Sequence, residues 1–164
     1  MLNKGDWLWP AIWLLPVRNE YGDWPASGEI DIIEARANKQ LTTSSSFVDG
    51  AQIGISQMTT TLHWGPYFGA DNWALTHDQY TLANGDFSDA FHTWVLEWTP
   101  QGFAASVDNA VYFNVSTKDG YWSKGNYDMN QPGSFNPWMY GNIDAPFDKE
   151  FFIIINLAVG GVSG

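Results

Sequence analysis

The chain has 164 residues, which is enough for one hydrophobic core but short for two domains. Seven basic residues stand against 18 acidic ones, and the formal net charge of −11 argues against binding to nucleic acid or to anionic membranes. The absence of cysteine excludes disulfides, thiol catalysis and zinc–thiolate sites, and no run is long and apolar enough to span a bilayer.

Taken in chain order, the sequence has β-type patterning throughout and no convincing helical period. Runs of alternating or β-branched residues predict strands at Ala11–Leu15, Glu29–Glu34, Thr42–Val48, Thr59–Trp64, Gln79–Leu82, Phe91–Trp98, Gly102–Val107, Ala110–Val115 and Phe151–Ala158. Turn-rich segments separate these runs, and Asp108-Asn109 is a tight-hairpin signal between two of them. The pattern predicts an antiparallel β-sandwich, with no internal repeat and no linker between domains.

Aromatic residues are unusually frequent, at 16% of the chain. Two interpretations stay open, because large rings can fill a β-rich core or can line a groove where the apolar face of a sugar stacks on indole. The segment from Lys118 to Asn142 is long and rich in Gly, Asn, Pro and aromatic residues. A connection of that length is usually functional or disordered, and its aromatic content favours a function.

Three carboxylates interrupt the β-branched run Glu29–Glu34, although clustered negative charge raises the energy of each member. Strand alternation puts Glu29 and Asp31 on one face, whereas a regular strand would put Glu34 on the opposite, isoleucine face. One extra residue near Ile32-Ile33, a β-bulge, returns Glu34 to the face of the other two acids. The Cα atoms of the two glutamates then lie roughly 13 Å apart, about four strand steps. Leaning together over a concave sheet, they could approach the roughly 5–5.5 Å that retaining glycosidases use.

The alternative for these acids is a solvated acidic strand face without chemistry. The flanking isoleucines and Gly28 argue against it, because they place the strand inside a sheet. Asp31, between the two glutamates, is then expected to tune their protonation.

Five motifs occur in an order that resembles a known family. They are Trp9-Pro10-Ala11-Ile12-Trp13, Trp24-Pro25-Ala26-Ser27-Gly28 with the acid strand after it, Thr61-Leu62-His63-Trp64-Gly65, Phe91-His92-Thr93-Trp94-Val95-Leu96-Glu97-Trp98-Thr99 and Asn156-Leu157-Ala158-Val159-Gly160-Gly161. Together they resemble family 16 glycoside hydrolases of the laminarinase type, especially the animal β-1,3-glucanase and glucan-binding-protein branch. The resemblance covers essentially the whole chain. It implies a concanavalin-like antiparallel β-jelly-roll sandwich with a glucan cleft on its concave face.

Matched residue by residue, the resemblance implies that Glu29 is the nucleophile, Asp31 an assisting acid and Glu34 the general acid/base. In the retaining scheme Glu34 then has to hold its proton near neutral pH while Glu29 stays charged. The resemblance also matches Trp13 and Trp24 to aromatic positions beside the cleft, and it matches His63 to a polar position near the catalytic centre.

Several candidates keep a structural alternative when the residues are considered alone. Trp13 could be core, and a structural histidine is the default for His63; His77 and His92 are interpreted as structural. Asn156 interrupts an apolar strand, where an amide is either bonded to backbone inside the core or lines the cleft. No His/Asp/Glu cluster has a convincing metal spacing, and no cofactor or metal is expected.

Three hypotheses follow for the chain as a single, partial glycoside hydrolase domain over residues 1–164, which we expect to be truncated at both ends. The first is a secreted endo-β-1,3-glucanase, monomeric, with β-glucan as its partner and no nucleic-acid or membrane partner. The second is a non-hydrolytic β-1,3-glucan recognition protein of the innate-immune type, which the three retained acids disfavour. The third is a truncated product whose open strand edge makes it aggregate.

Overall fold

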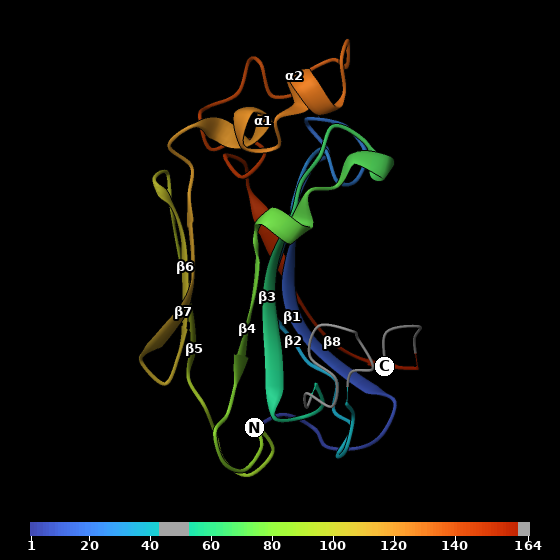
Figure 1. The fold of residues 1–164 in the computed structure, drawn as a ribbon, viewed down its shortest axis with the longest axis vertical. Coiled ribbons are helices and arrows are strands. Elements are labelled where there is room, and N and C mark those ends of the chain that lie inside the picture. Colours follow the sequence, from blue (N-terminus) through green and yellow to red (C-terminus); the bar gives the residue numbers. More distant parts are fainter. Residues whose placement is uncertain (43–52, 161–164) are drawn as a thin grey trace.

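Two antiparallel sheets face each other and form the body of the protein (Figure 1). The computed structural model describes residues 1–42 and 53–160. Five strands form the larger sheet, in the order β4-β3-β2-β1-β8, and β5-β6-β7 form the smaller one. Their bounds are β1 Leu8–Pro16, β2 Glu29–Glu34, β3 Gln57–His63, β4 His77–Thr81, β5 Trp94–Thr99, β6 Gly102–Val107, β7 Ala110–Ser116 and β8 Phe151–Val159.

This architecture confirms the predicted antiparallel sandwich, with eight of the predicted strands recovered within three residues at each end. The predicted strand Thr42–Val48 lies outside the described residues except for Thr42. The expected start of a strand at Phe91 is wrong, because β5 begins at Trp94. Just before β5, Thr93 bonds to the β6–β7 hairpin: its backbone N–H donates to the Asp108 side chain, and its carbonyl oxygen accepts the Asp108 N–H, each at 2.9 Å.

Strand β2 carries the predicted bulge. Trp13 on β1 pairs with Asp31, and the next residue back, Ile12, pairs with Ile33, so Ile32 has no partner on β1. On the other side, the register with β3 shifts between Asp31 and Glu34. Thr60 on β3, fully buried, donates its hydroxyl to the carbonyl oxygen of Ile32 at 2.7 Å and so satisfies the backbone at the bulge.

The hydrophobic core lies between the two sheets. Its position explains why the acids of β2 face away from the smaller sheet. Ile30 and Ile33, on either side of the bulge, are 0% and 1% exposed, and they belong to two clusters of buried apolar residues. Phe103 and Phe113 from the smaller sheet pack into the first cluster, Val107 into the second. Because Ile30 and Ile33 face this core, Asp31 and Glu34 face the opposite, open side of the larger sheet.

One end of the sandwich is closed by helices that the sequence pattern does not predict. Within Lys118 to Asn142 lie α1, Gly120–Lys124, and α2, Tyr127–Asn130 (Figure 1). Helices of four or five residues are too short to show a 3.6-residue period, so the pattern misses them. Two short 3₁₀ helices, η1 at Phe68–Ala70 and η2 at Trp73–Leu75, lie in the connection between β3 and β4.

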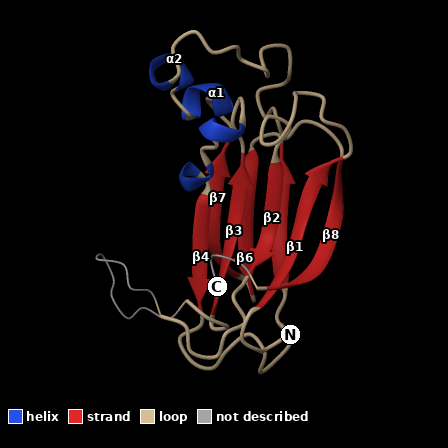
Figure 2. Ribbon diagram, turned by 90° about the vertical axis from the view of Figure 1, so that its right-hand side faces the viewer, coloured by secondary structure: helices blue, strands red, loops and turns tan. Residues whose placement is uncertain are grey.

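Strand β8 is the edge of the larger sheet, beside β1 (Figure 2). Its residues alternate, so one set faces the open side with the acids and the other faces the side of the smaller sheet. In the second set Phe151 packs against the core, whereas the others are 42–77% exposed, so the described part of the smaller sheet does not cover them; these residues are Ile153, Ile155, Leu157 and Val159. The described residues hold no helix that has both the length and the apolar character needed to cross a membrane.

Candidate active site

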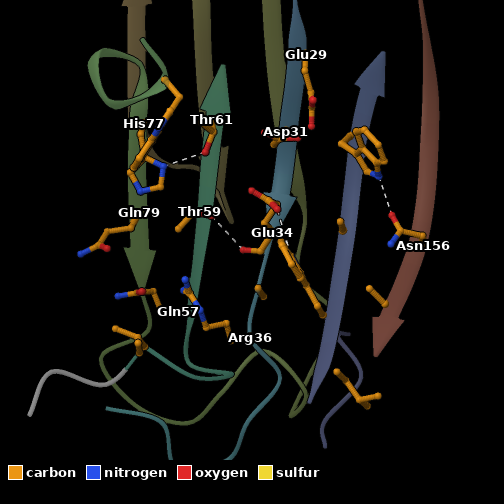
Figure 3. A pocket seen from close by; sticks show the side chains of 18 of the residues that line it. Glu29, Asp31, Glu34, Arg36, Gln57, Thr59, Thr61, His77, Gln79 and Asn156 are labelled. Carbon is orange, nitrogen blue, oxygen red and sulfur yellow. Dashed lines mark hydrogen bonds between the residues drawn. The ribbon is translucent and has the colours of Figure 1, made fainter. Parts of the chain in front are cut away.

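A cleft of about 740 Å³ runs across the open face of the larger sheet. Its floor holds the three acids of β2, Glu29, Asp31 and Glu34. Figure 3 shows these acids along one strand, with polar side chains of β3 and β4 on one side and Asn156 of β8 on the other. Tryptophans of β1 and the loops line the cleft as well; these are Trp7, Trp9, Trp13, Trp24 and Trp73. The cleft therefore combines carboxylates with flat apolar rings, a composition suited to a sugar chain.

Glu29 lies at the start of β2 and is held by the loop before it. Trp24 donates its indole N–H to Glu29 Oε2 at 2.5 Å. Gly28, between them, has φ +83°, and a Cβ there would lie 2.8 Å from a ring carbon of Phe147, so this turn requires glycine. Trp24 is thus placed beside the cleft, as the sequence predicts, and its polar edge is directed at a carboxylate.

The pKa of Glu29 is raised to about 8, mainly because the carboxyl is desolvated and then because Asp31 is negatively charged beside it. The charge of His63 and the Trp24 N–H oppose the shift. Burial thus opposes the charged form of Glu29 that the retaining scheme requires. The strand pattern alone does not show this burial.

Glu34 lies past the bulge and accepts a hydrogen bond from the Trp9 indole N–H at 3.2 Å. Burial raises its pKa to about 7, the negative charge of Asp31 adds to the rise, and His63 opposes it. This direction agrees with the prediction that neighbouring carboxylates push the pKa of Glu34 upward. Burial and the charge of Asp31 therefore raise the pKa of both glutamates.

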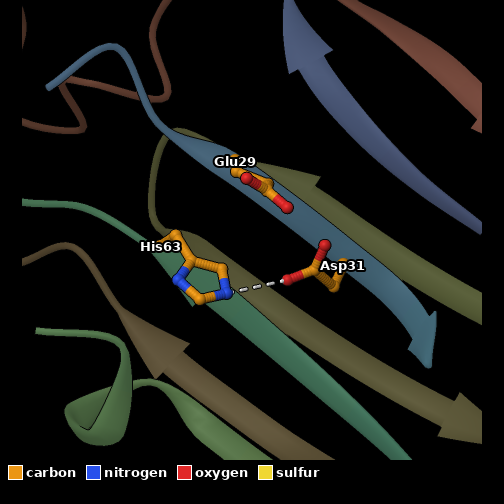
Figure 4. Close-up of side chains that lie close together, drawn as sticks. All are labelled: Glu29, Asp31 and His63. Carbon is orange, nitrogen blue, oxygen red and sulfur yellow. Dashed lines mark ion pairs between the residues drawn. The ribbon is translucent and has the colours of Figure 1, made fainter. Parts of the chain in front are cut away.

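Asp31 is 2% exposed and lies between the two glutamates in the sequence of β2. Its Oδ2 atom is 3.3 Å from His63 Nε2 (Figure 4). His63 is buried, which disfavours its charge, but the carboxylates of Asp31 and Asp71 outweigh burial and raise its pKa to about 10. A positively charged imidazole therefore compensates the negative charge of Asp31. His63 also lines the cleft, so its position is more than structural.

Trp13 and Asn156 come together across β1 and β8. Trp13 donates its indole N–H to Asn156 Oδ1 at 2.7 Å, and both side chains line the cleft. The default of a core amide for Asn156 is therefore wrong, because its strand is an edge and its side chain points to the open face. Trp13 and Trp24 also line a second cavity of about 420 Å³ that adjoins Glu29.

Sequence reasoning missed several polar residues of the cleft. His77, interpreted as structural, lines the cleft, and its Nδ1 is 2.9 Å from the Thr61 hydroxyl oxygen. The other missed polar residues are Arg36, Gln57, Thr59, Thr61 and Gln79. Strand alternation could have found Thr59 and Thr61, because they share a face with His63 on β3. His92, by contrast, is a structural residue as expected, with its Nδ1 2.6 Å from Asp108 beside the β6–β7 hairpin.

The cluster of Glu29, Asp31 and His63 was not visible from residue spacing. One possible ligand atom from each lies within 4.8 Å of the others (Figure 4). Within it, His63 Nε2 lies 3.3 Å from Asp31 Oδ2, and the other ring nitrogen lies 2.6 Å from Asp71 Oδ2. We therefore interpret His63 and Asp31 as an ion pair of the cleft floor.

Comparison with known proteins places this cleft in a family. The sequence model of "Glycosyl hydrolases family 16" matches residues 2–141. A β-1,3-glucan-binding protein of Penaeus monodon is 42% identical over 99% of this chain and 41% of its own length. A glucan endo-1,3-beta-glucosidase of Cryptopygus antarcticus is 38% identical over 98% of this chain and 48% of its own. The chain thus spans less than half the length of these two relatives.

Solved structures agree with the sequence relatives. The laminarinase of Rhodothermus marinus superposes with a TM-score of 0.63 at 27% identity, covering 98% of this chain and 51% of that one. The catalytic domain of an endo-1,3-beta-glucanase from Thermotoga petrophila gives a TM-score of 0.64, also at 27% identity, with 98% and 50% covered. The two antiparallel sheets are therefore those of the jelly roll of these enzymes. The chain belongs to glycosyl hydrolase family 16.

Proposed function

We propose that this chain carries the catalytic face of an endo-acting hydrolase of β-1,3-glucan of the laminarin type. The observation that carries the proposal is the bulge in β2, which brings Glu29, Asp31 and Glu34 to one face, on the floor of an aromatic cleft. Two carboxyl groups that flank the scissile bond are what a retaining glycosidase needs. The family match and the glucan endo-1,3-beta-glucosidase relative support the same substrate class.

In the proposed mechanism a Glu29 carboxylate oxygen attacks the anomeric carbon, and the bond from that carbon to the leaving oxygen breaks. The proton of Glu34 passes to the leaving oxygen, which yields a glycosyl ester on Glu29. Glu34, now ionised, takes a proton from water while the water oxygen attacks the anomeric carbon. The ester breaks, Glu29 is released as carboxylate, and Glu34 is protonated again.

The reactive form has Glu29 ionised and Glu34 protonated. Trp24 supports that distribution, because its 2.5 Å hydrogen bond to Glu29 is shorter than the 3.2 Å bond from Trp9 to Glu34. The negative charge of Asp31 raises the pKa of Glu29 and of Glu34 alike, so the Trp24 hydrogen bond is what distinguishes the two carboxyls. Trp13, Trp24 and Asn156 are proposed to bind the sugar rings, the indoles by stacking and the amide by hydrogen bonds.

The test is to incubate the chain with laminarin, lichenan and agarose and to measure the release of reducing ends. Laminarin is expected to be cleaved, and Glu29→Gln and Glu34→Gln are each expected to abolish cleavage. Glu97→Gln, at an exposed glutamate on β5, is the matched control and should cleave as the unsubstituted chain does. A cooperative melting transition in all four proteins ensures that loss of cleavage is not loss of fold.

A second function has a specific observation in its favour, namely the glucan-binding-protein relative at 42% identity. In that alternative the same cleft recognises β-1,3-glucan without turnover. Binding of laminarin without any product would establish it and overturn the hydrolase. An extracellular location and a monomeric state remain part of the proposal, and size-exclusion chromatography with light scattering tests the second.

A further inference from the structure

Asp71 lies outside the acid strand, in the connection between η1 and η2, yet it is bound to the site through His63. Its Oδ2 atom is 2.6 Å from His63 Nδ1. Its other oxygen, Oδ1, accepts backbone N–H groups from Trp64 at 3.2 Å and from Trp73 at 3.1 Å. The carboxylate is therefore fixed by the loop backbone, and only one of its oxygens faces the imidazole.

His63 is fixed from three sides. Asp71 holds Nδ1, Asp31 Oδ2 lies 3.3 Å from Nε2, and the Trp24 ring packs on the imidazole with 5.5 Å between ring centroids. Asp71, His63 and Asp31 thus form a line of alternating charge that ends at the acid between the two glutamates. We call this line the Asp71 relay.

We propose that Asp71 is a positioning residue of the catalytic site, which acts by holding the His63 ring in the orientation and charge state that compensate Asp31. The proposal rests on the proposed glycosidase function and extends it to a residue that lies off the acid strand. In the proposed arrangement the Asp71 carboxylate accepts the Nδ1 proton, so the Nε2 proton is directed at Asp31. The relay supplies the positive charge without which Asp31 would be a buried, uncompensated carboxylate.

Several titratable groups surround the His63 ring and affect its charge. Glu29, Asp31 and Glu34 face it from β2, Asp71 from the loop, and His77 from β4. Trp24 connects the ring to the nucleophile, because the same indole contacts His63 and donates to Glu29. A displaced imidazole would therefore disturb both the charge of Asp31 and the position of the Trp24 N–H.

The test is Asp71→Asn. Asparagine keeps one carbonyl oxygen for the two backbone N–H groups, so the substitution removes mainly the contact with His63. Asp119→Asn is the matched control, because Asp119 is exposed and its side chain does not cap α1. Both variants are checked for a cooperative melting transition, and both are assayed on laminarin together with the unsubstituted chain.

The first readout is the ¹⁵N NMR signal of the His63 ring at pH 7. In the unsubstituted chain both ring nitrogens should be protonated, and in Asp71→Asn the ring should change to a neutral form. A neutral His63 in the unsubstituted chain would overturn the proposal, whether or not the variant folds. An unchanged ring signal in a folded Asp71→Asn would overturn it as well.

The second readout is kcat and KM on laminarin, which distinguishes a positioning role of Asp71 from a purely structural one. Loss of orientation in a folded protein should lower kcat on the order of 10-fold to 100-fold with KM within about 2-fold. Equal kcat in Asp71→Asn and in the unsubstituted chain would overturn the proposal. If the unsubstituted chain itself does not cleave laminarin, the hydrolase proposal fails, and the catalytic role of Asp71 fails with it. The ring signals then still show whether the relay holds His63 charged, so the two failures are distinguishable.

Discussion

Glu34 should destabilise the folded protein at neutral and alkaline pH, and Glu34→Gln should relieve that cost. The pKa of Glu34 is raised from 4.5 to about 7 in the fold, so the folded state binds this proton more tightly than the unfolded state does. The free energy of unfolding therefore falls as pH rises from about 4.5, and the loss is complete above about 7. A rise in pKa of this size corresponds to roughly 3 kcal/mol, and partial exposure reduces the expected value to about 2–3 kcal/mol.

The assay is urea unfolding of the unsubstituted chain, Glu34→Gln and the exposed-site control Glu97→Gln at pH 4, 6 and 8. Glutamine has nearly the same shape and can still accept the Trp9 N–H, but it does not ionise. At pH 4 Glu34→Gln and the unsubstituted chain should be nearly equal in stability. At pH 8 Glu34→Gln should be more stable by about 2–3 kcal/mol, and the control should show little of this change. A stability difference that does not depend on pH would refute the reasoning.

Three further predictions each concern the substitution of one residue. Trp24→Phe keeps a ring beside the cleft but removes the N–H bonded to Glu29, so kcat on laminarin should fall at least about 10-fold with a smaller change in KM; an unchanged kcat would contradict it. Gly28→Ala adds a Cβ to a residue with φ +83°, 2.8 Å from a ring carbon of Phe147. Urea unfolding should therefore show a loss of about 1–3 kcal/mol in the free energy of unfolding, and an unchanged stability would contradict the strain expected at this turn. Ile155→Lys changes a side chain that is 75% exposed, so urea unfolding should show a change in stability of less than about 0.5 kcal/mol. A large loss of stability would show that this side chain is buried in solution.

The bulge could be predicted from sequence because two requirements conflict on a regular strand. Glu34 cannot share the core face with Ile30, and one extra residue removes the conflict. The observed registers with β1 and β3 show that extra residue at the predicted place. The alternation of side chains between the two faces of a strand is a local pattern. The bulge could therefore be predicted without knowing the rest of the fold.

Other parts of the site depend on contacts between distant segments. The raised pKa of Glu29 comes from burial and from the charge of Asp31, and the raised pKa of His63 comes from Asp31 and from Asp71 on a loop. Asn156 lies 143 residues from Trp13 in sequence, and only the pairing of β1 with β8 brings them together. Such features are set by tertiary packing, and a single sequence contains no local pattern for them.

The most direct test of the proposed mechanism is to trap the covalent intermediate. The chain is incubated with an activated 2-deoxy-2-fluoro derivative of a β-1,3-linked glucose disaccharide, whose fluorine slows hydrolysis of the ester. It is then digested and analysed by mass spectrometry. The proposed mechanism predicts one added disaccharide per chain, on Glu29, and no label on Glu29→Gln. A label on Asp31 or Glu34, or cleavage of laminarin by Glu29→Gln at an undiminished rate, would contradict it.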